Sequence, residues 1–485
     1  MDKIIHSISD IVWSDALIYL CLITGLYFSV RTGFLQVTYL KEMVKLLFSK
    51  NDSTKGISSF QAFSLAISGR VGTGNIVGVA TAIAMGGPGA VFWMWLIAFL
   101  GSASAFIEAT LGQLYKQESN GEYRGGPAYY IEKGLGIKWY AVLFAITTII
   151  STGLLLPGVQ SNSIASAMNN SFSLGTVNYD LPVIGDFPVN YIGILIMILL
   201  ALIIFGGVKR LGKTAEFVVP FMAGIYILMA VIIIVINIKE VPAVLSLIFS
   251  SAFNMNATFG GVFGMAIAWG VKRGIYSNEA GQGTAPHAAA AAEVKHPAQQ
   301  GLVQAFSVYI DTLFVCSATA FIILFTGQYN VLRTDGSYVV QNISGVDYTG
   351  FTQAAVSHVF PGIGKEFVAF ALFFFAFTTI MAYYYYAETN ISYITKSGNK
   401  KIYIWILRIV FLFAVYLGTI KEAKVAWALG DIGVGLMAWI NIIAILLLGN
   451  ITLKVWKDYK VKRKTGHIYF NSKEAGIKNA DFWEK

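Results

Sequence analysis

Charged residues are scarce in this sequence. Asp, Glu, Lys and Arg make up 13% of the 485 residues, whereas 56% are hydrophobic and the mean hydropathy is +0.64. A soluble chain of this size could not cover its surface with so few polar groups. Long stretches carry no charge at all, such as the 37 residues between Arg70 and Glu108. Because about 20 apolar residues span a bilayer, the composition predicts an all-α protein that crosses a membrane many times.

Cysteine and histidine are also rare. Cys21 and Cys316 are the two cysteines, and both lie in apolar stretches, so we interpret them as small buried side chains. None of the five histidines stands in an HExxH motif, which excludes an intramembrane metalloprotease. The motif pair of a presenilin-like aspartyl protease is missing, because Tyr179-Asp180 lies in a polar segment and Ala428 replaces the first glycine of GxGD. We therefore expect no enzymatic function.

The apolar stretches predict eleven spans, at about 11–30, 58–84, 88–115, 139–168, 189–208, 214–238, 251–271, 301–326, 366–394, 402–419 and 425–450. No basic segment with a cleavage site precedes the first span, which we interpret as a retained helix. When the loops alternate between the two sides, 27 Lys and Arg fall on one side and six on the other. The positive-inside rule places the N-terminus outside and the C-terminus in the cytoplasm of a cell-membrane protein. The net charge of +9 is explained by this excess of Lys and Arg on one side of the membrane, so no nucleic-acid partner is expected.

Glycine-rich stretches interrupt the second and the seventh expected spans. The second contains SGRVGTGNIVG at 68–78, and the seventh contains FGGVFG at 259–264. Each opens a run of five spans, and the two runs have opposite orientations, which is typical of transporters built from inverted repeats. Lys272 and Arg273 follow the seventh span and are expected at the inner surface. The expected organisation is an extra helix with an inner loop (1–50), two five-helix repeats (51–240 and 241–450) and a basic cytoplasmic tail (451–485).

A broken helix inside a bilayer exposes backbone groups, which is tolerated where protein or a wet cavity surrounds them. Freed amides at a positive helix end bind a carboxylate, and freed carbonyls with nearby hydroxyls bind a hard cation such as Na⁺. Glycine allows the ligand to approach a bare backbone. The alternative interpretation is close helix packing, because Gly74 and Gly78 form a GxxxG motif.

Several polar side chains lie within the other spans. Thr378 and Thr379 in the ninth span are either cation ligands or bonded to their own helix. Gln160 in the fourth span is expected to line the pocket. Gly260 and Gly261 are expected to form a pocket wall without side chains, which limits the substrate to a small size.

A second group of residues is expected to act as gates. Arg70 is a costly charge within a span, so it either pairs with an acidic partner or extends to the inner face. The candidate partners are Glu108, Glu216, Asp311, Glu388 and Asp431. Asn278 and Glu279 are expected to pin the inner gate. They precede an alanine-rich segment that we expect to form an inner loop helix, with Pro286 in its first turn.

Two strings identify a family that the chain resembles. GRVGTGNIVGVATAIAMGGPGAVFWMW and GVKRGIYSNEAGQGTAPHAAAAA are similar to the alanine or glycine:cation symporter family, and the resemblance covers roughly residues 10–455. It implies sodium-coupled uptake of small neutral amino acids, alanine and glycine. It also implies the leucine-transporter fold with one extra helix before its ten-helix core. A proton-coupled amino-acid transporter and a channel are the alternatives, although no repeated pore loop or charged ring favours a channel.

The resemblance also implies roles for particular residues. The family motif V-G-x-G-N corresponds to 71–75, so the amides of Thr73 and Gly74, beside Asn75, would hold the substrate carboxylate, and Gln160 would be a polar substrate contact. The tyrosine run 383–386 departs from the family pattern. The expected sodium ligands are the carbonyl oxygens of Ser68 and Val71 and the hydroxyls of Thr378 and Thr379.

Overall fold

A computed structural model describes residues 2–49, 56–119, 121–181, 185–256, 258–395 and 400–484. The described chain is mostly helical, which confirms the all-α class. Within it the strands form three antiparallel pairs, all of them in loops between helices. The pairs are β1 (Gln117–Ser119) with β2 (Glu122–Arg124), β3 (Thr176–Leu181) with β4 (Gly185–Asn190), and β5 (Asn330–Leu332) with β6 (Tyr338–Gln341).

Eight helices in the described ranges are long and apolar enough to cross a membrane. Two of them contain a π-helical turn, and the first joins two helices. They are α1 (Asp2–Val12) with α2 (Asp15–Thr32), α7 (Gly89–Leu114), α9 (Lys138–Ile150) with α10 (Leu156–Phe172), α12 (Gly207–Ile236), α16 (Pro297–Tyr309) with α17 (Ser317–Thr326), α19 (Gly364–Ile394), α20 (Lys400–Ile420) and α21 (Ala423–Thr465).

The three other expected spans are helical but short or interrupted. The span expected at 58–84 is divided into α5 (Ser59–Arg70), the π-helical turn η1 (Gly74–Gly78) and α6 (Val79–Gly86). The span expected at 189–208 is α11 (Tyr191–Ile204), and the one expected at 251–271 overlaps α13 (Val241–Ala252) and α14 (Phe263–Asn278). Shorter helices complete the chain: α3 (Leu35–Thr38), α4 (Leu40–Leu47), α8 (Pro127–Tyr130), α15 (Ala285–Ala291) and α18 (Phe351–Val359).

The second interruption does not lie where the glycines at 259–264 predict it. That stretch forms a 3₁₀ turn (Gly260–Val262) and the first turn of α14, which then runs unbroken to Asn278. The chain breaks at 279–284 instead, because Glu279, Gly281 and Gly283 all have positive φ angles, of 55°, 82° and 86°. Glycine permits a break, but a left-handed backbone is what ends this helix.

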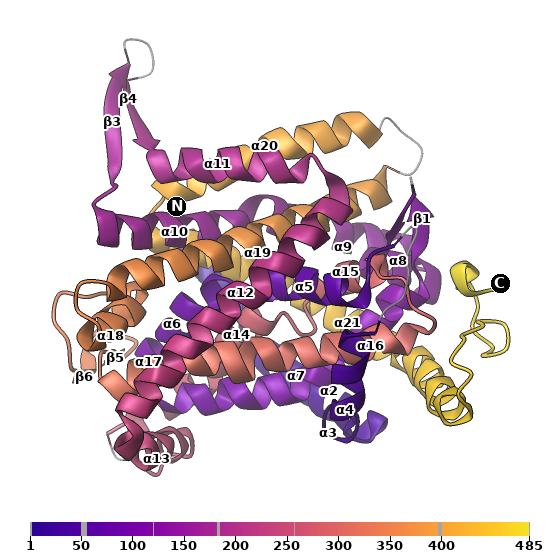
Figure 1. Cartoon of the computed structure of the whole chain (residues 1–485), viewed down its shortest axis with the longest axis horizontal. Coiled ribbons are helices and arrows are strands. Elements are labelled where there is room, and N and C mark those ends of the chain that lie inside the picture. The colour runs from indigo at the N-terminus through magenta and orange to yellow at the C-terminus, as the bar shows by residue number, and fades with distance from the viewer. Residues whose placement is uncertain are drawn as a thin grey trace.

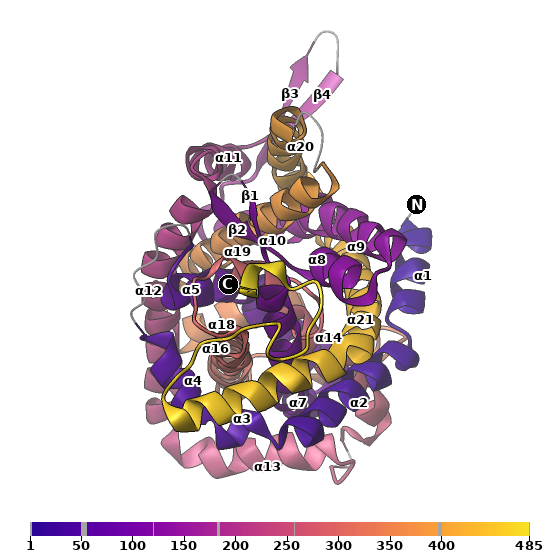
Figure 2. The same ribbon diagram turned by 90° about the vertical axis from the view of Figure 1, so that its right-hand side faces the viewer.

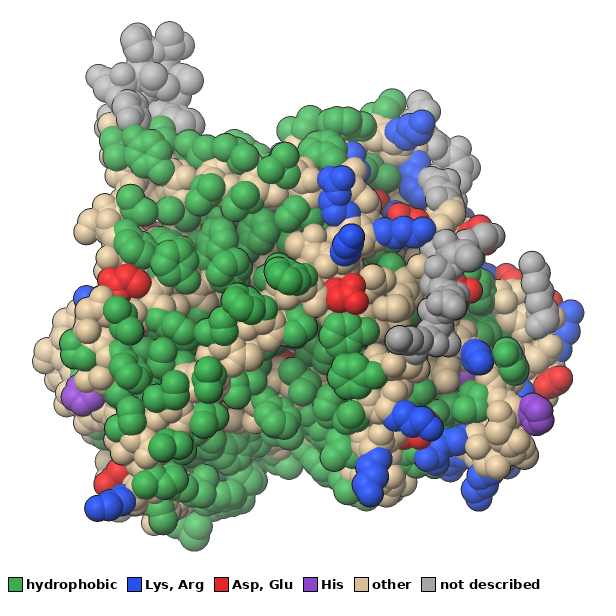
Figure 3. All heavy atoms as spheres, in the orientation of Figure 1, with side chains coloured by type: hydrophobic (Ala, Val, Ile, Leu, Met, Phe, Trp, Pro, Cys, Tyr) green, Lys and Arg blue, Asp and Glu red, His purple; other side chains and the backbone are tan. Residues whose placement is uncertain are grey.

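Several long helices, among them α7, α10, α16 and α19, run along the long axis of the molecule, which is horizontal in Figure 1, whereas α12 crosses the view obliquely. Hydrophobic side chains cover much of the face in Figure 3, whereas most Lys and Arg side chains lie toward the right-hand end, where Figure 1 places β1 and the C-terminus. Large apolar side chains are exposed on the outer helices, for example Leu202 on α11 and Phe217 on α12. This arrangement fits a bundle surrounded by lipid, with its basic residues gathered on one side.

Candidate functional site

At the interruption after α5, the backbone amides of Gly72 and Asn75 change their hydrogen-bond acceptors. In a continuous helix the amide of Gly72 would donate to Ser68 and that of Asn75 to Val71. Here the Gly72 amide donates to Oδ1 of Asn75 at 2.8 Å, and the Asn75 amide donates to the carbonyl of Gly72 at 3.2 Å. The carbonyl oxygens of Ser68 and Val71 therefore lose their helical donors.

These two carbonyl oxygens meet a hydroxyl of α19. The Thr379 Oγ1 atom lies 2.8 Å from the Ser68 oxygen, 3.3 Å from the Val71 oxygen and 3.0 Å from the oxygen of Phe375. A hydroxyl has one hydrogen to donate, so it cannot satisfy three carbonyls at once. A buried group of oxygens with too few hydrogens is the ligand set that a hard cation prefers.

The two adjacent threonines do not share this position. The Thr378 hydroxyl lies 3.0 Å from the carbonyl oxygens of Phe374 and Phe375 on its own helix, and 3.9 Å from the sulfur of Met222. The structure therefore brings Thr379 to the break and leaves Thr378 bonded to the preceding turn, as hydroxyls on membrane helices commonly are.

Gln160 of α10 reaches the same break. Its Oε1 atom accepts a hydrogen bond from the Thr73 amide at 3.0 Å. A Cβ atom on Gly72 would lie 2.4 Å from the Thr379 Oγ1 atom and 2.9 Å from the Gln160 Oε1 atom. Gly72 is therefore the position at which two side chains approach bare backbone, a role that the sequence motif alone did not assign to it.

The next two residues of the motif anchor the break to its neighbours. A Cβ atom on Gly74 would lie 3.1 Å from the Cα of Ser277 on α14. Asn75 donates to Oδ1 of Asp311 at 2.6 Å, and Ser277 donates to the same carboxylate at 3.0–3.1 Å. Asn75 therefore fixes the backbone at the first break, because its side chain bonds both to the Gly72 amide and to Asp311. Sequence reasoning considered Asp311 only as a partner of Arg70, although an aspartate inside an apolar span is itself a signal.

The second break, at 279–284, lies next to the first. Glu108 on α7 accepts hydrogen bonds from the amides of Gly281 and Gly283 at 3.2 and 3.1 Å, and from Asn441 at 2.8 Å. The Glu279 carboxylate accepts from the Thr284 hydroxyl at 2.8 Å and lies 3.2 Å from the Cβ position of Gly69. Glu108 thus acts as a capping side chain, because it accepts from the free backbone amides just before α15.

The remaining residues of this break are also held by polar contacts. Asn278 donates to the Thr312 hydroxyl at 3.3 Å and accepts from the Ala280 amide at 3.0 Å. The alanine-rich segment is α15, with Pro286 in its first turn as expected. Its residues are all buried, so α15 is the second half of an interrupted helix and the expectation of an inner loop helix was wrong.

Arg70 follows neither of the two expectations for it. It is buried, with 1% of its surface exposed, so it does not extend to the inner face. Its guanidinium donates to the carbonyl of Gln304 at 3.2 Å and to the Ser307 hydroxyl. No ion pair to Arg70 is found among the described residues, although two of its nitrogens have no hydrogen-bond partner there. Arg70 therefore links α5 to α16 without a direct carboxylate contact.

Gly260 and Gly261 are not brought to the site. Gly261 is exposed, and a Cβ atom built on it would meet nothing within 4 Å. The glycines of 259–264 lie near the end of α6, where Phe259 approaches Gly87, rather than beside Thr73. A bulkier side chain lies near the first break instead. The hydroxyl oxygen of Tyr386, in the buried tyrosine run, lies 2.6 Å from the Cβ position of Gly69.

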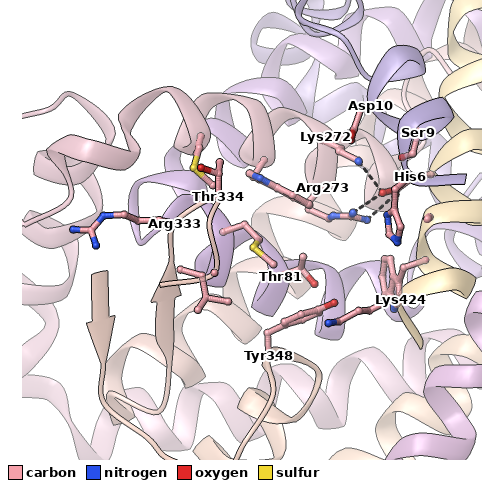
Figure 4. A pocket seen from close by; sticks show the side chains of 18 of the residues that line it. His6, Ser9, Asp10, Thr81, Lys272, Arg273, Arg333, Thr334, Tyr348 and Lys424 are labelled. Carbon is pink, nitrogen blue, oxygen red and sulfur yellow. Dashed lines mark hydrogen bonds and ion pairs between the residues drawn. The ribbon is translucent and has the colours of Figure 1, made fainter. Parts of the chain in front are cut away.

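A cavity of about 570 Å³ lies between α6 and α14, and Figure 4 shows its lining. Arg273 makes two hydrogen bonds to the Asp431 carboxylate at 2.9 and 2.8 Å, and Lys272 lies 2.7 Å from it. His6 and Tyr348, from segments expected outside, line the same cavity. Lys272 and Arg273 therefore lie on the same cavity as these two segments, whereas the sequence placed them on the opposite side of the membrane. The reason is that the helix breaks only after Asn278, so α14 carries both residues before the break.

The comparisons with known proteins decide the family. A model of the sodium:alanine symporter family matches residues 1–472. The chain belongs to this family. Members of the sodium:alanine symporter family are transporters, so the expectation of a multi-pass membrane transporter rather than an enzyme is confirmed.

Relatives with names cover nearly the whole of this symporter chain. It is 59% identical to the putative sodium/proton-dependent alanine carrier protein YrbD of Bacillus subtilis strain 168, over 100% of this chain and 98% of the relative. It is 49% identical to the sodium/proton-dependent alanine carrier protein of Bacillus sp. strain PS3, over 91% and 97%. The probable sodium/glutamine symporter GlnT of B. subtilis is 43% identical, over 96% and 92%.

A solved structure is similar at lower identity. It is the substrate-bound outward-open state of a Na⁺-coupled sialic acid symporter, with a TM-score of 0.47 and 12% identity, over 93% of this chain and 86% of that one. The division of this chain into two inverted repeats stays a prediction from the sequence.

Proposed function

We propose that this protein couples inward sodium movement to the uptake of small neutral amino acids, alanine and glycine. The observation that carries the proposal is the group of three carbonyl oxygens around the Thr379 hydroxyl, next to a broken helix. The named relatives support it, since two of them are called sodium/proton-dependent alanine carriers. The cytoplasm would lie on the side where the basic residues gather.

The two ligands would bind to adjacent parts of one break. Sodium would be held by the carbonyl oxygens of Ser68, Val71 and Phe375 with the Thr379 hydroxyl. The substrate carboxylate would bind the amides of Thr73 and Gly74, where the Gln160 carbonyl oxygen now accepts from Thr73. Because Val71 and Thr73 are two residues apart, an ion that fixes the Val71 carbonyl also fixes the amide that the substrate needs. This shared backbone would couple the two affinities.

In this proposal two contacts close access to the break, one toward each end of the bundle. The buried contact of Arg273 with Asp431 separates it from the outer cavity. Toward the opposite end, the Ile57 amide donates to Ala291 and the Glu293 amide donates to Ile57, each at 3.0 Å. This bridge joins the start of α5 to the end of α15. In alternating access, one closure would open while the other stays intact, and Glu108 and Glu279 would hold the second break during that movement.

The test is uptake of labelled alanine by purified protein in proteoliposomes. We expect an inward sodium gradient to drive accumulation, and we expect unlabelled glycine to compete for uptake while leucine competes weakly. Uptake driven equally by a pH gradient without sodium would favour proton coupling. Glutamine is a necessary competitor, because one relative is named a glutamine symporter. Absence of alanine uptake under either gradient would contradict the proposal.

A further inference from the structure

The residues after α21 do not extend freely from the membrane. Residues 466–484, which we call the C-terminal strap, fold back across the end of the bundle that faces the viewer in Figure 2. Phe470, Ile477 and Trp483 are buried there, each with less than 8% of its surface exposed. The Trp483 indole donates to the carbonyl of Gln113 on α7 at 2.9 Å. The strap therefore has a defined docking position.

The aromatic end of the strap encloses a lysine. The Lys116 ammonium lies 4.4 Å from the ring centres of Tyr123 and Phe482 and 5.3 Å from that of Trp483. It also donates to the carbonyl of Ala292 at 2.8 Å. A cation surrounded by aromatic faces is favourable when it is desolvated. The strap thus completes a cage around the Lys116 ammonium. The other sides of this cage are Tyr123, in the segment after α7, and the Ala292 carbonyl after α15.

This cage is connected to both interrupted helices. Tyr123 packs edge-on against Phe482 and lies 2.9 Å from the Cβ position of Gly56, just before α5. Gln113, which accepts from Trp483, donates through its side chain to the carbonyls of Ala289 and Ala292 at the end of α15. The strap therefore braces the ends of α5 and α15 where the Ile57 bridge joins them.

Three further contacts hold the strap on two neighbouring segments. Asp481 pairs with Lys133 at 2.6 Å, and Asn479 donates to the Lys133 carbonyl at 3.0 Å. The Phe470 amide donates to the carbonyl of Lys295 at 3.1 Å, before α16. These anchors lie on two separate segments, the π-helical turn Ile131–Leu135 before α9 and the loop between α15 and α16, so the strap spans the closure rather than covering one helix.

We propose that the C-terminal strap locks the inner closure and that its release favours the state open on that side. The family match ends at residue 472, so the segment that carries Phe482 and Trp483 lies beyond it. The inference rests on the alternating access proposed above. A strap that bridges α7, α15 and the entry to α5 can stay docked only while those ends remain together, so it stabilises one of the two states.

A reporter cysteine on the inner half of α5 tests the lock. Ser64 is fully buried there, so Ser64→Cys should react with a thiol reagent only when the closure opens. We expect the double change Phe482→Ala with Trp483→Ala, and a chain that ends at Thr465, to speed labelling about tenfold. That factor corresponds to about 1.4 kcal/mol between two states. The chain without the reporter gives the background of its two buried native cysteines.

Two controls separate a lock from general loosening. Tyr469→Ala removes an exposed aromatic ring from the same strap and should leave the labelling rate unchanged. Thr81→Cys lines the outer cavity and should react no faster in the strap variants. Equal acceleration at both reporters, or no acceleration at Ser64→Cys, would overturn the lock. Labelling requires no transport, so a chain that fails to take up alanine but shows the expected labelling would contradict the proposed function and support the lock.

Discussion

At the scale of single residues, Thr379 is the side chain on which sodium coupling depends most directly. Thr379→Val keeps the shape but removes the hydroxyl that, within the described part of the chain, reaches the carbonyls of Ser68 and Val71. We expect sodium-driven alanine uptake to fall at least about tenfold, since a lost oxygen ligand in a buried site costs on the order of 1–3 kcal/mol. The measurement is initial uptake as a function of sodium concentration.

Thr378→Val is the matched control for this change. The hydrogen bonds of the Thr378 hydroxyl to described residues go to its own helix and to Met222, so its loss should alter uptake much less than the loss of the Thr379 hydroxyl. Equal sodium dependence in wild type and Thr379→Val would show that the cation binds elsewhere. Equal losses in both single variants would mean that the hydroxyl pair acts as a unit.

Gly74 tests whether the break or the GxxxG motif matters. A Cβ atom on Gly74 would lie 3.1 Å from the Cα of Ser277, whereas one on Gly78 would meet nothing closer than 3.8 Å. We expect Gly74→Leu to abolish alanine binding in detergent, and Gly78→Ala to bind normally. Equal loss in the two variants would favour simple helix packing, and normal binding by Gly74→Leu would exclude the carboxylate site.

At the scale of elements, each of two helices is interrupted, and the two breaks are held in different ways. Asn75 closes the first break from within, because its side chain accepts from the Gly72 amide. Glu108 holds the second from a neighbouring helix, because its carboxylate accepts from Gly281 and Gly283. A break held from another element moves with that element, so α7 and the second break should shift together.

Glu108→Ala should therefore destabilise the protein and stop uptake. The change leaves the buried amides of Gly281 and Gly283 without their acceptor, and each unsatisfied group costs about 1–3 kcal/mol. It also removes one of the two acceptors of the Asn441 side chain, which keeps the Gly281 carbonyl. Thermal unfolding in detergent and sodium-driven uptake are the two measurements. Glu240→Ala, at an exposed turn, is the control and should change neither quantity. A stable, active Glu108→Ala protein would show that the second break needs no external acceptor.

At the scale of the whole molecule, the outer closure depends on one carboxylate that faces two cations. Asp431 is buried between Arg273 and Lys272, so Asp431→Asn removes the carboxylate that the buried Arg273 and the partly buried Lys272 share. Breaking such a contact costs about 3–5 kcal/mol. We expect Asp431→Asn to lose most of its uptake and to label faster at Thr81→Cys in the outer cavity.

Lys272→Met is the comparison variant for Asp431→Asn and should have a smaller effect. It keeps both hydrogen bonds of Arg273 to Asp431 and leaves the pair neutral, so the closure and most of the uptake should remain. If Lys272→Met loses as much uptake as Asp431→Asn, net charge in the outer cavity, rather than the Arg273 contact, governs entry.

Composition and local pattern by themselves determined the class of this protein. Scarce charge and long apolar stretches require a helical membrane protein, because an unpaired backbone is too costly in lipid. The motif at 71–75 predicted the first break, since backbone freedom at glycine is a local property. The family resemblance rested on the same local strings.

Only the tertiary structure decided which side chains meet at the breaks. It moved the second break to 279–284, removed Gly260 and Gly261 from the site, and separated Thr379 from Thr378. The physical reason is that helices in lipid are apolar on all sides, so hydrophobic periodicity does not show which face of a helix points inward. That face is set by contacts between distant segments, such as Glu108 with Gly281, which no local pattern contains.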